Sequence, residues 1–174
     1  MRITKFAGLP AHPLFVHIPV VLLPLVAIGA IGMALSARIR DRLGWVVLVL
    51  SIIAGLSTQL AIGSGKALVD SVTKSSALDQ HVAIAESIRP LALLLFVVAL
   101  GVMLLDRRAR SQWPFRQSDQ KTAPPWMNVV LAAMTVTVAL ATCARLYQIG
   151  DSGAKATWQN TPVVRTDANR ASSD

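Results

Sequence analysis

Cysteine is almost absent from this chain. The single cysteine, Cys143, lies inside an apolar run, so no intramolecular disulfide can form. The motif C-x-x-C-H, which attaches c-type haem covalently, is missing as well. We interpret Cys143 as a small side chain packed among apolar neighbours.

Charged residues are also scarce. They make up 15% of the chain, against roughly 25% in typical soluble proteins. The net charge is +8, but the basic residues cluster beside apolar segments, as they do in the loops of membrane proteins. There is no separate basic and aromatic surface to contact bases or phosphates, so we predict no nucleic-acid partner.

Long apolar runs dominate the chain instead. A helix needs about 20 apolar residues to cross a hydrocarbon core about 30 Å thick. Four segments reach this length, at about residues 14–37, 44–62, 88–105 and 126–149. We predict an all-α fold, an integral membrane bundle of four transmembrane helices over residues 1–156. Residues 157–174 form a polar tail without apolar periodicity, which we expect to be disordered.

The basic residues predict which side of the membrane each loop faces. Loops one and three together carry eight Lys and Arg residues: Arg38, Arg40, Arg42, Arg107, Arg108, Arg110, Arg116 and Lys121. The longer second loop carries Lys66, Lys74 and Arg89. Because cytoplasmic loops are enriched in Lys and Arg, we predict that loops one and three are cytoplasmic. Both termini then lie outside, in a multi-pass protein of the bacterial cytoplasmic membrane.

The second and fourth spans end alike. One ends in QLAIGSGKAL from Gln59 and the other in RLYQIGDSGAKAT from Arg145, so both contain Ile-Gly, Ser-Gly and Lys-Ala steps. We interpret the match as two repeated helical hairpins in the same orientation, related by an axis along the membrane normal. Glycine and serine that simply end helices would explain part of the pattern. In the repeat, Gly63 and Gly150 should be equivalent and permit a backbone turn.

The three histidines of the chain map to one end of this bundle. His12 and His17 open the first span within the stretch HPLFVHIP, and His81 falls in the outer loop before the third span. An imidazole finds no hydrogen-bond partner in lipid, so we expect these rings to line a polar site. Arg145 lies near the same end, about one turn before the fourth span finishes.

Several kinds of site fit these residues. Haem b is held by axial imidazoles, usually from different helices, and its propionates favour an arginine. His17 and His81 would then be the ligands, with Arg145 as the propionate partner. A copper or zinc ion could instead use His12, His17 and His81 with Asp70 or Glu86. In a third interpretation each histidine only caps a helix or bonds a carbonyl.

These sites lead to three functional hypotheses. The first is a redox-linked membrane protein that binds haem b or a metal on the outer side and meets a membrane or extracytoplasmic redox protein. The second is a cofactor-free structural or accessory subunit of a membrane complex. The third, a small transporter, is disfavoured because the spans carry few mid-membrane charges. Ser64, Ser71 and Ser152 lie near the outer end without a matched base, so the sequence does not decide whether the protein is an enzyme.

The HPLFVHIP stretch and the later IGDSGAKATW make the chain similar to the domain-of-unknown-function 2231 family of bacterial four-span membrane proteins. The resemblance covers about residues 9–158. The residues that match the family's first motif, H-P-x-x-V-H-F-P, are His12, Pro13, Val16, His17 and Pro19. His81 matches a later histidine, whereas Asp151 stands where many relatives have one. The resemblance implies a membrane module, and relatives joined to Rieske-type iron–sulfur domains imply electron transfer by association.

Overall fold

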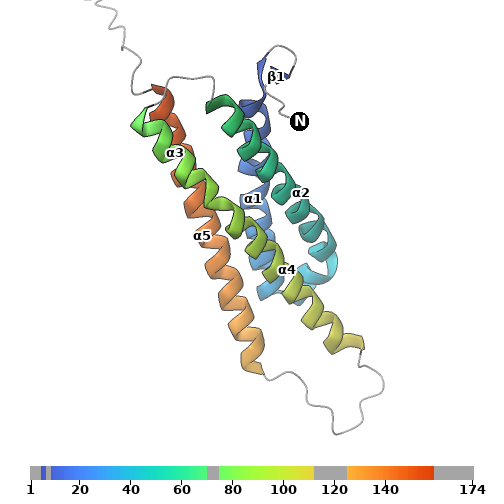
Figure 1. Ribbon diagram of the computed structural model, residues 1–174. Coiled ribbons are helices and arrows are strands. Elements are labelled where there is room, and N and C mark those ends of the chain that lie inside the picture. The colour runs from blue at the N-terminus through green and yellow to red at the C-terminus, as the bar shows by residue number, and fades with distance from the viewer. Residues whose placement is uncertain (1–4, 7–8, 70–74, 112–124, 159–174) are drawn as a thin grey trace, which may run out of the picture.

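Four long helical segments form the body of the protein (Figure 1). The computed structural model describes residues 5–6, 9–69, 75–111 and 125–158. Its elements are β1 (Lys5–Phe6), β2 (Leu9–Pro10), α1 (Ala11–Leu35), α2 (Ala37–Val69), α3 (Ser76–Glu86), α4 (Ile88–Ser111) and α5 (Pro125–Trp158). The helical segments long and apolar enough to cross a membrane are His12–Leu35, Ala37–Val69, Ser76–Leu105 and Trp126–Trp158. The prediction of an all-α bundle with four transmembrane helices is confirmed.

The helices are longer than the apolar runs that predicted them. α2 begins at Ala37 rather than near residue 44, so Ser36 alone separates it from α1 and the first basic loop is helical. α5 likewise continues to Trp158, beyond the predicted limit at residue 156. Hydropathy marks only the apolar part of a helix, whereas arginine is a good helix former that extends a helix into water. Thr157 and Trp158, which were predicted to begin a disordered tail, are the last two residues of α5. The rest of the predicted tail, residues 159–174, lies outside the described residues.

The segment before the third span is also helical. α3 begins after Ser75, whose hydroxyl accepts a hydrogen bond from the Leu78 N–H at 3.2 Å, as an N-cap residue does. It ends at Glu86, and Ser87 alone separates it from α4. His81 therefore lies on a helix, and its expected place in a loop is wrong. The helical setting fixes the direction in which the His81 ring points.

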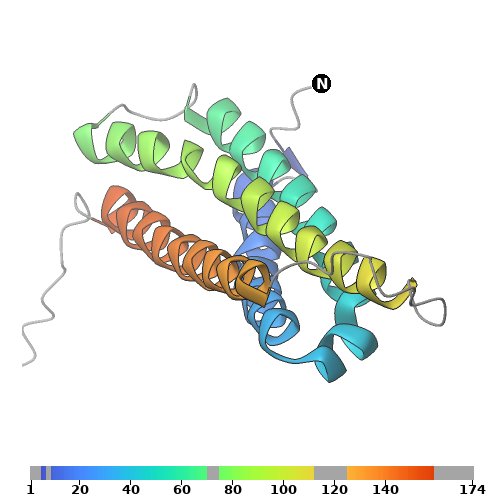
Figure 2. The same ribbon diagram turned by 90° about the horizontal axis from the view of Figure 1, so that it is seen from below.

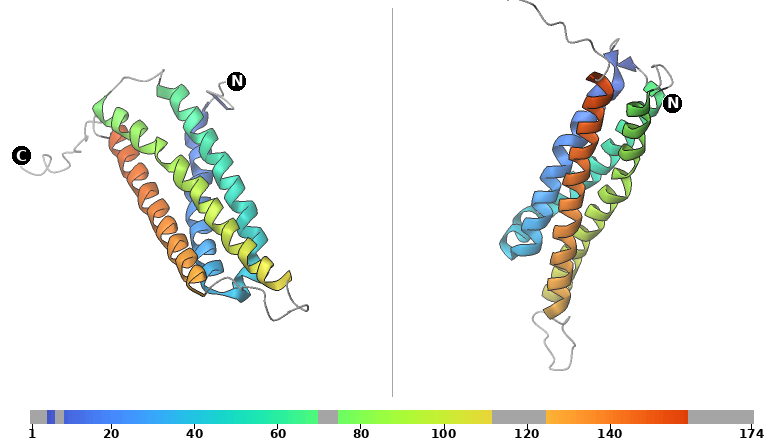
Figure 3. Two further views of the ribbon diagram at one scale, coloured as in Figure 1. Left: turned by 60° about the horizontal axis from the view of Figure 1, so that its bottom comes forward. Right: turned by 90° about the vertical axis from the view of Figure 1, so that its left-hand side faces the viewer.

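The bundle places several chain segments at the same end. In Figure 1 the start of α1, the end of α2, helix α3 and the end of α5 all lie at the top, while the α1–α2 connection lies at the other end. α1 contacts α2, α4 and α5, and α2 also contacts α4. Figure 2 shows α1 between α2 and α5, and the right-hand view of Figure 3 shows α1 and α5 side by side. α3 packs against α5.

The core is made of apolar and small polar side chains. Leu23, Met33 and Leu95 are among its largest fully buried side chains. Thr135 and Thr142 are also fully buried, and each hydroxyl donates to the backbone carbonyl four residues earlier. This pairing satisfies a polar group that would otherwise be expensive to bury. The outer surface carries many exposed Leu, Ile and Val side chains, which suits contact with lipid.

The close approach of α1 to α2 depends on a glycine. A Cβ at Gly29 would lie 2.7 Å from Val47 Cγ2, so no larger residue fits there without a shift. A Cβ at Gly55, by contrast, would meet no atom of the described residues within 4 Å. The small residue at position 29 therefore lets the two helices pack at short range.

Candidate functional site: a histidine-lined cavity

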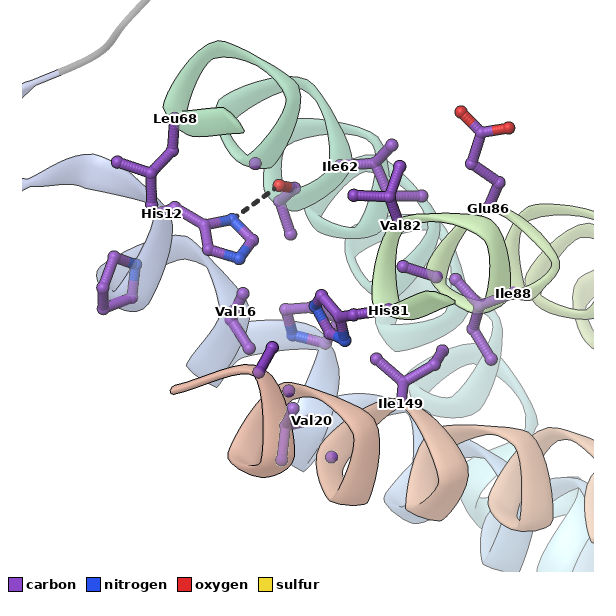
Figure 4. Close-up of a pocket in the computed structure, with 18 of the residues that line it drawn as sticks. His12, Val16, Val20, Ile62, Leu68, His81, Val82, Glu86, Ile88 and Ile149 are labelled. Carbon is purple, nitrogen blue, oxygen red and sulfur yellow. Dashed lines mark hydrogen bonds between the residues drawn. The ribbon is translucent and has the colours of Figure 1, made fainter. Parts of the chain in front are cut away.

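A cavity of about 570 Å³ opens at the end of the bundle where α3 lies. Residues from all five helices line it, and most of its lining side chains are apolar. Its polar lining residues include the three histidines, His12, His17 and His81. Figure 4 shows the rings of His12 and His81 pointing into this space between the helices. The prediction that the histidines gather at one end of the bundle is thus met by the geometry.

His12 is held by α2, far away in the sequence. Its Nδ1 lies 2.9 Å from the Ala61 carbonyl oxygen and 3.3 Å from Ser64 Oγ (Figure 4 shows the former). The Ser64 hydroxyl itself donates to the Ala61 carbonyl. A carbonyl oxygen can only accept, so Nδ1 of His12 carries the proton. In the neutral ring, Nε2 is then left with a lone pair.

His81 is held by α5 in a similar way. Its Nδ1 lies 3.0 Å from Ser152 Oγ. The Ser152 hydroxyl donates its single hydrogen to the Ile149 carbonyl, so it can only accept from the ring. Nδ1 of His81 therefore carries the proton as well, and Nε2 is the nitrogen with the free lone pair.

His17 has a local partner. Its Nδ1 bonds the Pro13 carbonyl one turn earlier on the same helix, and its side chain is exposed. The carbonyl again requires the proton on Nδ1. His17 thus shares the tautomer of the other two histidines, but its hydrogen-bond partner among the described residues belongs to α1 itself.

Two glycines lie directly against the cavity histidines. A Cβ at Gly65 would lie 2.9 Å from His12 Cε1, and a Cβ at Gly153 would lie 3.1 Å from His81 Cε1. Gly63 and Gly150 have no such neighbour among the described residues, and both lie inside continuous helices. The expected backbone turn at those two positions is wrong. The glycines that make room for the histidine rings are Gly65 and Gly153, which follow Ser64 and Ser152.

An ion pair joins α2 and α3 beside the histidines. Lys66 Nζ lies 2.6 Å from Glu86 Oε1, both side chains are about half exposed, and both residues line the cavity. An exposed pair of this kind adds little stability by itself. It places one positive and one negative charge beside an otherwise mainly apolar space.

A comparison with models of protein families identifies the family of this chain. The family model described as "Predicted membrane protein (DUF2231)" matches residues 8–165. The chain belongs to the DUF2231 family. The match confirms the resemblance seen in the sequence, and the membrane description agrees with the four long apolar helices. No curated protein and no solved structure matches the chain.

Two residues considered from the sequence, Arg145 and Asp151, have partners on their own helix in this DUF2231 protein. Arg145 is not among the cavity-lining residues, and its guanidinium donates to Gln148 on the same helix. Asp151 forms an ion pair of 2.7 Å with Lys155, one turn further along α5. Asp70 lies outside the described residues. Among the described residues, no group of three or more His, Cys, Asp or Glu side chains is arranged to hold a metal ion.

The sequence argument missed Ser64 and Ser152 as partners of the histidines. It placed both near the outer end but gave them no role, because it sought a nucleophile with a base. Both serines are buried, and both contact a histidine Nδ1. The repeated Ser-Gly step was the available signal, since it marks the two places where a histidine ring packs on a helix.

Proposed function

We propose that this protein binds a cofactor through histidine nitrogens in the cavity, with haem b as the leading candidate, and that it takes part in electron transfer. One observation carries the proposal: all three cavity histidines donate from Nδ1 to an oxygen. Histidines that bind a metal almost always donate their other ring N–H to such an acceptor, which fixes the tautomer and orients the ring.

The cavity suits a group of this kind. Its volume of about 570 Å³ lies within the range of about 300–1,000 Å³ that is usual for small-molecule and cofactor sites. Its mainly apolar lining favours a flat apolar macrocycle. Lys66 also lines it and would be the cation for an acidic substituent once its side chain leaves Glu86. The proposed contact of Arg145 with a propionate would require its side chain to leave Gln148.

Within this proposal the protein supplies binding, orientation and shielding. When bound, haem b would supply an iron that gains and loses one electron. The histidines would offer Nε2 as ligands, and the oxygen partners of Nδ1 would hold each ring in place. Apolar side chains such as Val16, Val20 and Ile149 would keep water away from the group.

A copper or zinc ion is the second candidate. It is favoured by the presence of all three histidines in one cavity, because imidazole is a good ligand for both metals. The set of His12, His17 and His81 with Asp70 would need the three rings to converge further than they do in this structure. Metal analysis separates this candidate from haem.

The membrane orientation is part of the same proposal. We place the cavity on the outer side of the bacterial cytoplasmic membrane, because the opposite end of the bundle carries the arginines at the start of α2 and at the end of α4. An extracytoplasmic or membrane redox protein would then be the partner. The labelling experiment described in the Discussion tests this orientation.

An optical spectrum with metal analysis tests the cofactor. The protein should be purified in mild detergent from cells that are supplied with ample haem precursor. We expect absorption bands that sharpen on reduction and about one haem per chain, as for iron with two imidazole ligands. Protein that is colourless and free of metal would contradict the proposal and would support the cofactor-free accessory subunit instead.

A further inference from the structure

The two helical hairpins hold His12 and His81 in the same way. In each case a histidine Nδ1 contacts a serine hydroxyl, Ser64 for one ring and Ser152 for the other. Each serine donates its own hydrogen to the carbonyl three residues earlier on its helix. Each serine is followed by a glycine against which the ring lies. The same local arrangement therefore occurs once in each half of the chain.

The contacts with the glycines agree in detail. From a Cβ at Gly65, the nearest His12 atoms are Cε1 at 2.9 Å, Nδ1 at 3.1 Å and Nε2 at 3.6 Å. From a Cβ at Gly153, the nearest His81 atoms are Cε1 at 3.1 Å, Nδ1 at 3.4 Å and Nε2 at 3.7 Å. The atoms follow in the same order, so the two rings lie on their helices in matching orientations.

His17 is held differently. Its partner, the Pro13 carbonyl, is four residues away on its own helix. Among the described glycines, none has an atom of His17 among the three atoms nearest to its Cβ position. The His17 side chain is exposed, whereas His12 and His81 are partly buried. A ligand is most effective when other parts of the protein hold its ring still before the cofactor arrives.

From this juxtaposition we propose that His12 and His81, rather than His17, are the paired nitrogen ligands of the group in the cavity. The inference rests on the proposed function, and it changes the ligand pair that the sequence suggested. Each hairpin contributes one ring, and the two Ser-Gly steps are the positioning residues. The Ala61 carbonyl together with Ser64 keeps the proton on Nδ1 of His12, and Ser152 does so for His81. Gly65 and Gly153 leave room for the two rings.

Spectra of three single variants test the choice of ligands. His12→Ala, His17→Ala and His81→Ala should be purified from haem-supplied cells beside the wild type, and haem content and iron spin state should be measured for each. We expect His12→Ala and His81→Ala to lose the low-spin signal of iron with two imidazole ligands, and His17→Ala to keep it. Added free imidazole should restore the signal in the first two variants, because it can enter the space that the ring leaves.

The outcomes separate this inference from the proposed function. If His17→Ala loses the low-spin signal while His12→Ala keeps it, the choice of ligands is wrong and haem binding stands. If the wild type holds neither haem nor metal, both proposals fail. Should an alanine variant fold poorly, His12→Gln and His81→Gln replace it, since a Gln side-chain amide can still donate to the same acceptors while it offers no imidazole nitrogen.

The haem affinity of serine variants is a second test, because a serine with a merely structural role would not change it. Ser152→Ala should weaken haem binding by about 10–100-fold, as the loss of an outer hydrogen-bond partner usually does. Ser64→Ala should weaken it less, because the Ala61 carbonyl still accepts from His12 Nδ1. Thr137→Ala is the matched control, because its hydroxyl is exposed and bonds only the Ala133 carbonyl of its own helix. Equal haem affinity in all three variants would contradict the positioning role.

Discussion

Ser152 illustrates how one buried hydroxyl can set the protonation pattern of a histidine. Its hydrogen goes to the Ile149 carbonyl at 3.0 Å, and only its lone pairs remain for the ring of His81. A single serine therefore couples the backbone of α5 to the tautomer of a residue on α3.

Loss of that hydroxyl should lower the stability of the cofactor-free protein. Ser152→Ala leaves Nδ1 of His81 without its partner in a half-buried place, so we expect a loss of about 1–3 kcal/mol in the free energy of unfolding. Thermal unfolding in detergent, followed by circular dichroism, measures the change. A midpoint equal to that of Thr137→Ala would show that the His81 contact adds no stability.

Neighbouring glycines of α2 should respond to alanine in opposite directions. Gly65→Ala places a Cβ 2.9 Å from His12 Cε1, and such overpacking should cost about 1–3 kcal/mol. Gly63→Ala meets no described atom within 4 Å and should stabilise the helix by about 0.5–1 kcal/mol.

α5 offers the corresponding comparison. Gly153→Ala should destabilise the protein, and Gly150→Ala should not. Denaturation midpoints of the four variants give the result. If the changes at Gly63 and Gly65 have the same sign and size, the contact between His12 and α2 does not constrain the protein.

At the level of single residues, the sequence predicted where the histidines gather but not what holds them. The number and direction of the predicted spans placed the three rings at the same end of the bundle, and an imidazole beside an apolar run needs a polar site. The partners of His12 and His81 come from 49 or more residues away along the chain. Such contacts depend on how helices are rotated against each other, which composition and hydropathy do not specify.

Among the elements, the α1–α2 contact offers a direct test of close packing. Gly29→Ala would bring a Cβ to 2.7 Å from Val47 Cγ2 and should destabilise the protein by about 1–3 kcal/mol. Val47→Ala removes that methyl group, so the double variant should be more stable than the sum of the two single changes predicts. Gly55→Ala is the control, because its Cβ would face open space.

Unfolding free energies of the wild type, the two single variants and the double variant measure this coupling. Simple additivity of the changes at Gly29 and Val47 would mean that the helices do not approach as closely as described.

Helix number followed from the sequence more easily than helix length. Four apolar runs gave four spans, because a helix of that length crosses the hydrocarbon core and pairs its own backbone N–H and C=O groups there. The ends were missed at Ala37 and at α3, where polar and charged residues continue the helical backbone in water. The hydrophobic criterion contains no information about such extensions, and only local signals such as the Ser75 cap could have marked them.

For the molecule as a whole, the orientation in the membrane can be measured. In a Cys143→Ala background, single cysteines at positions 40 and 110 should be protected from an impermeant thiol reagent in intact cells, because they lie beside the basic loops. A cysteine at position 79, on the exposed side of α3, should react. Labelling in the opposite pattern would place the histidine cavity on the cytoplasmic side.

The division of the cavity between two hairpins has a consequence for assembly. With one ring on each half of the chain, any group that ligates both rings binds only the assembled bundle, so its binding free energy adds directly to the association of the halves. Two polypeptides split within residues 70–74 and expressed together would then pair more tightly when the group is supplied than when it is withheld. Under this linkage the group would act as a reporter of correct assembly in the membrane, because a lone hairpin would offer only one ring of the His12–His81 pair.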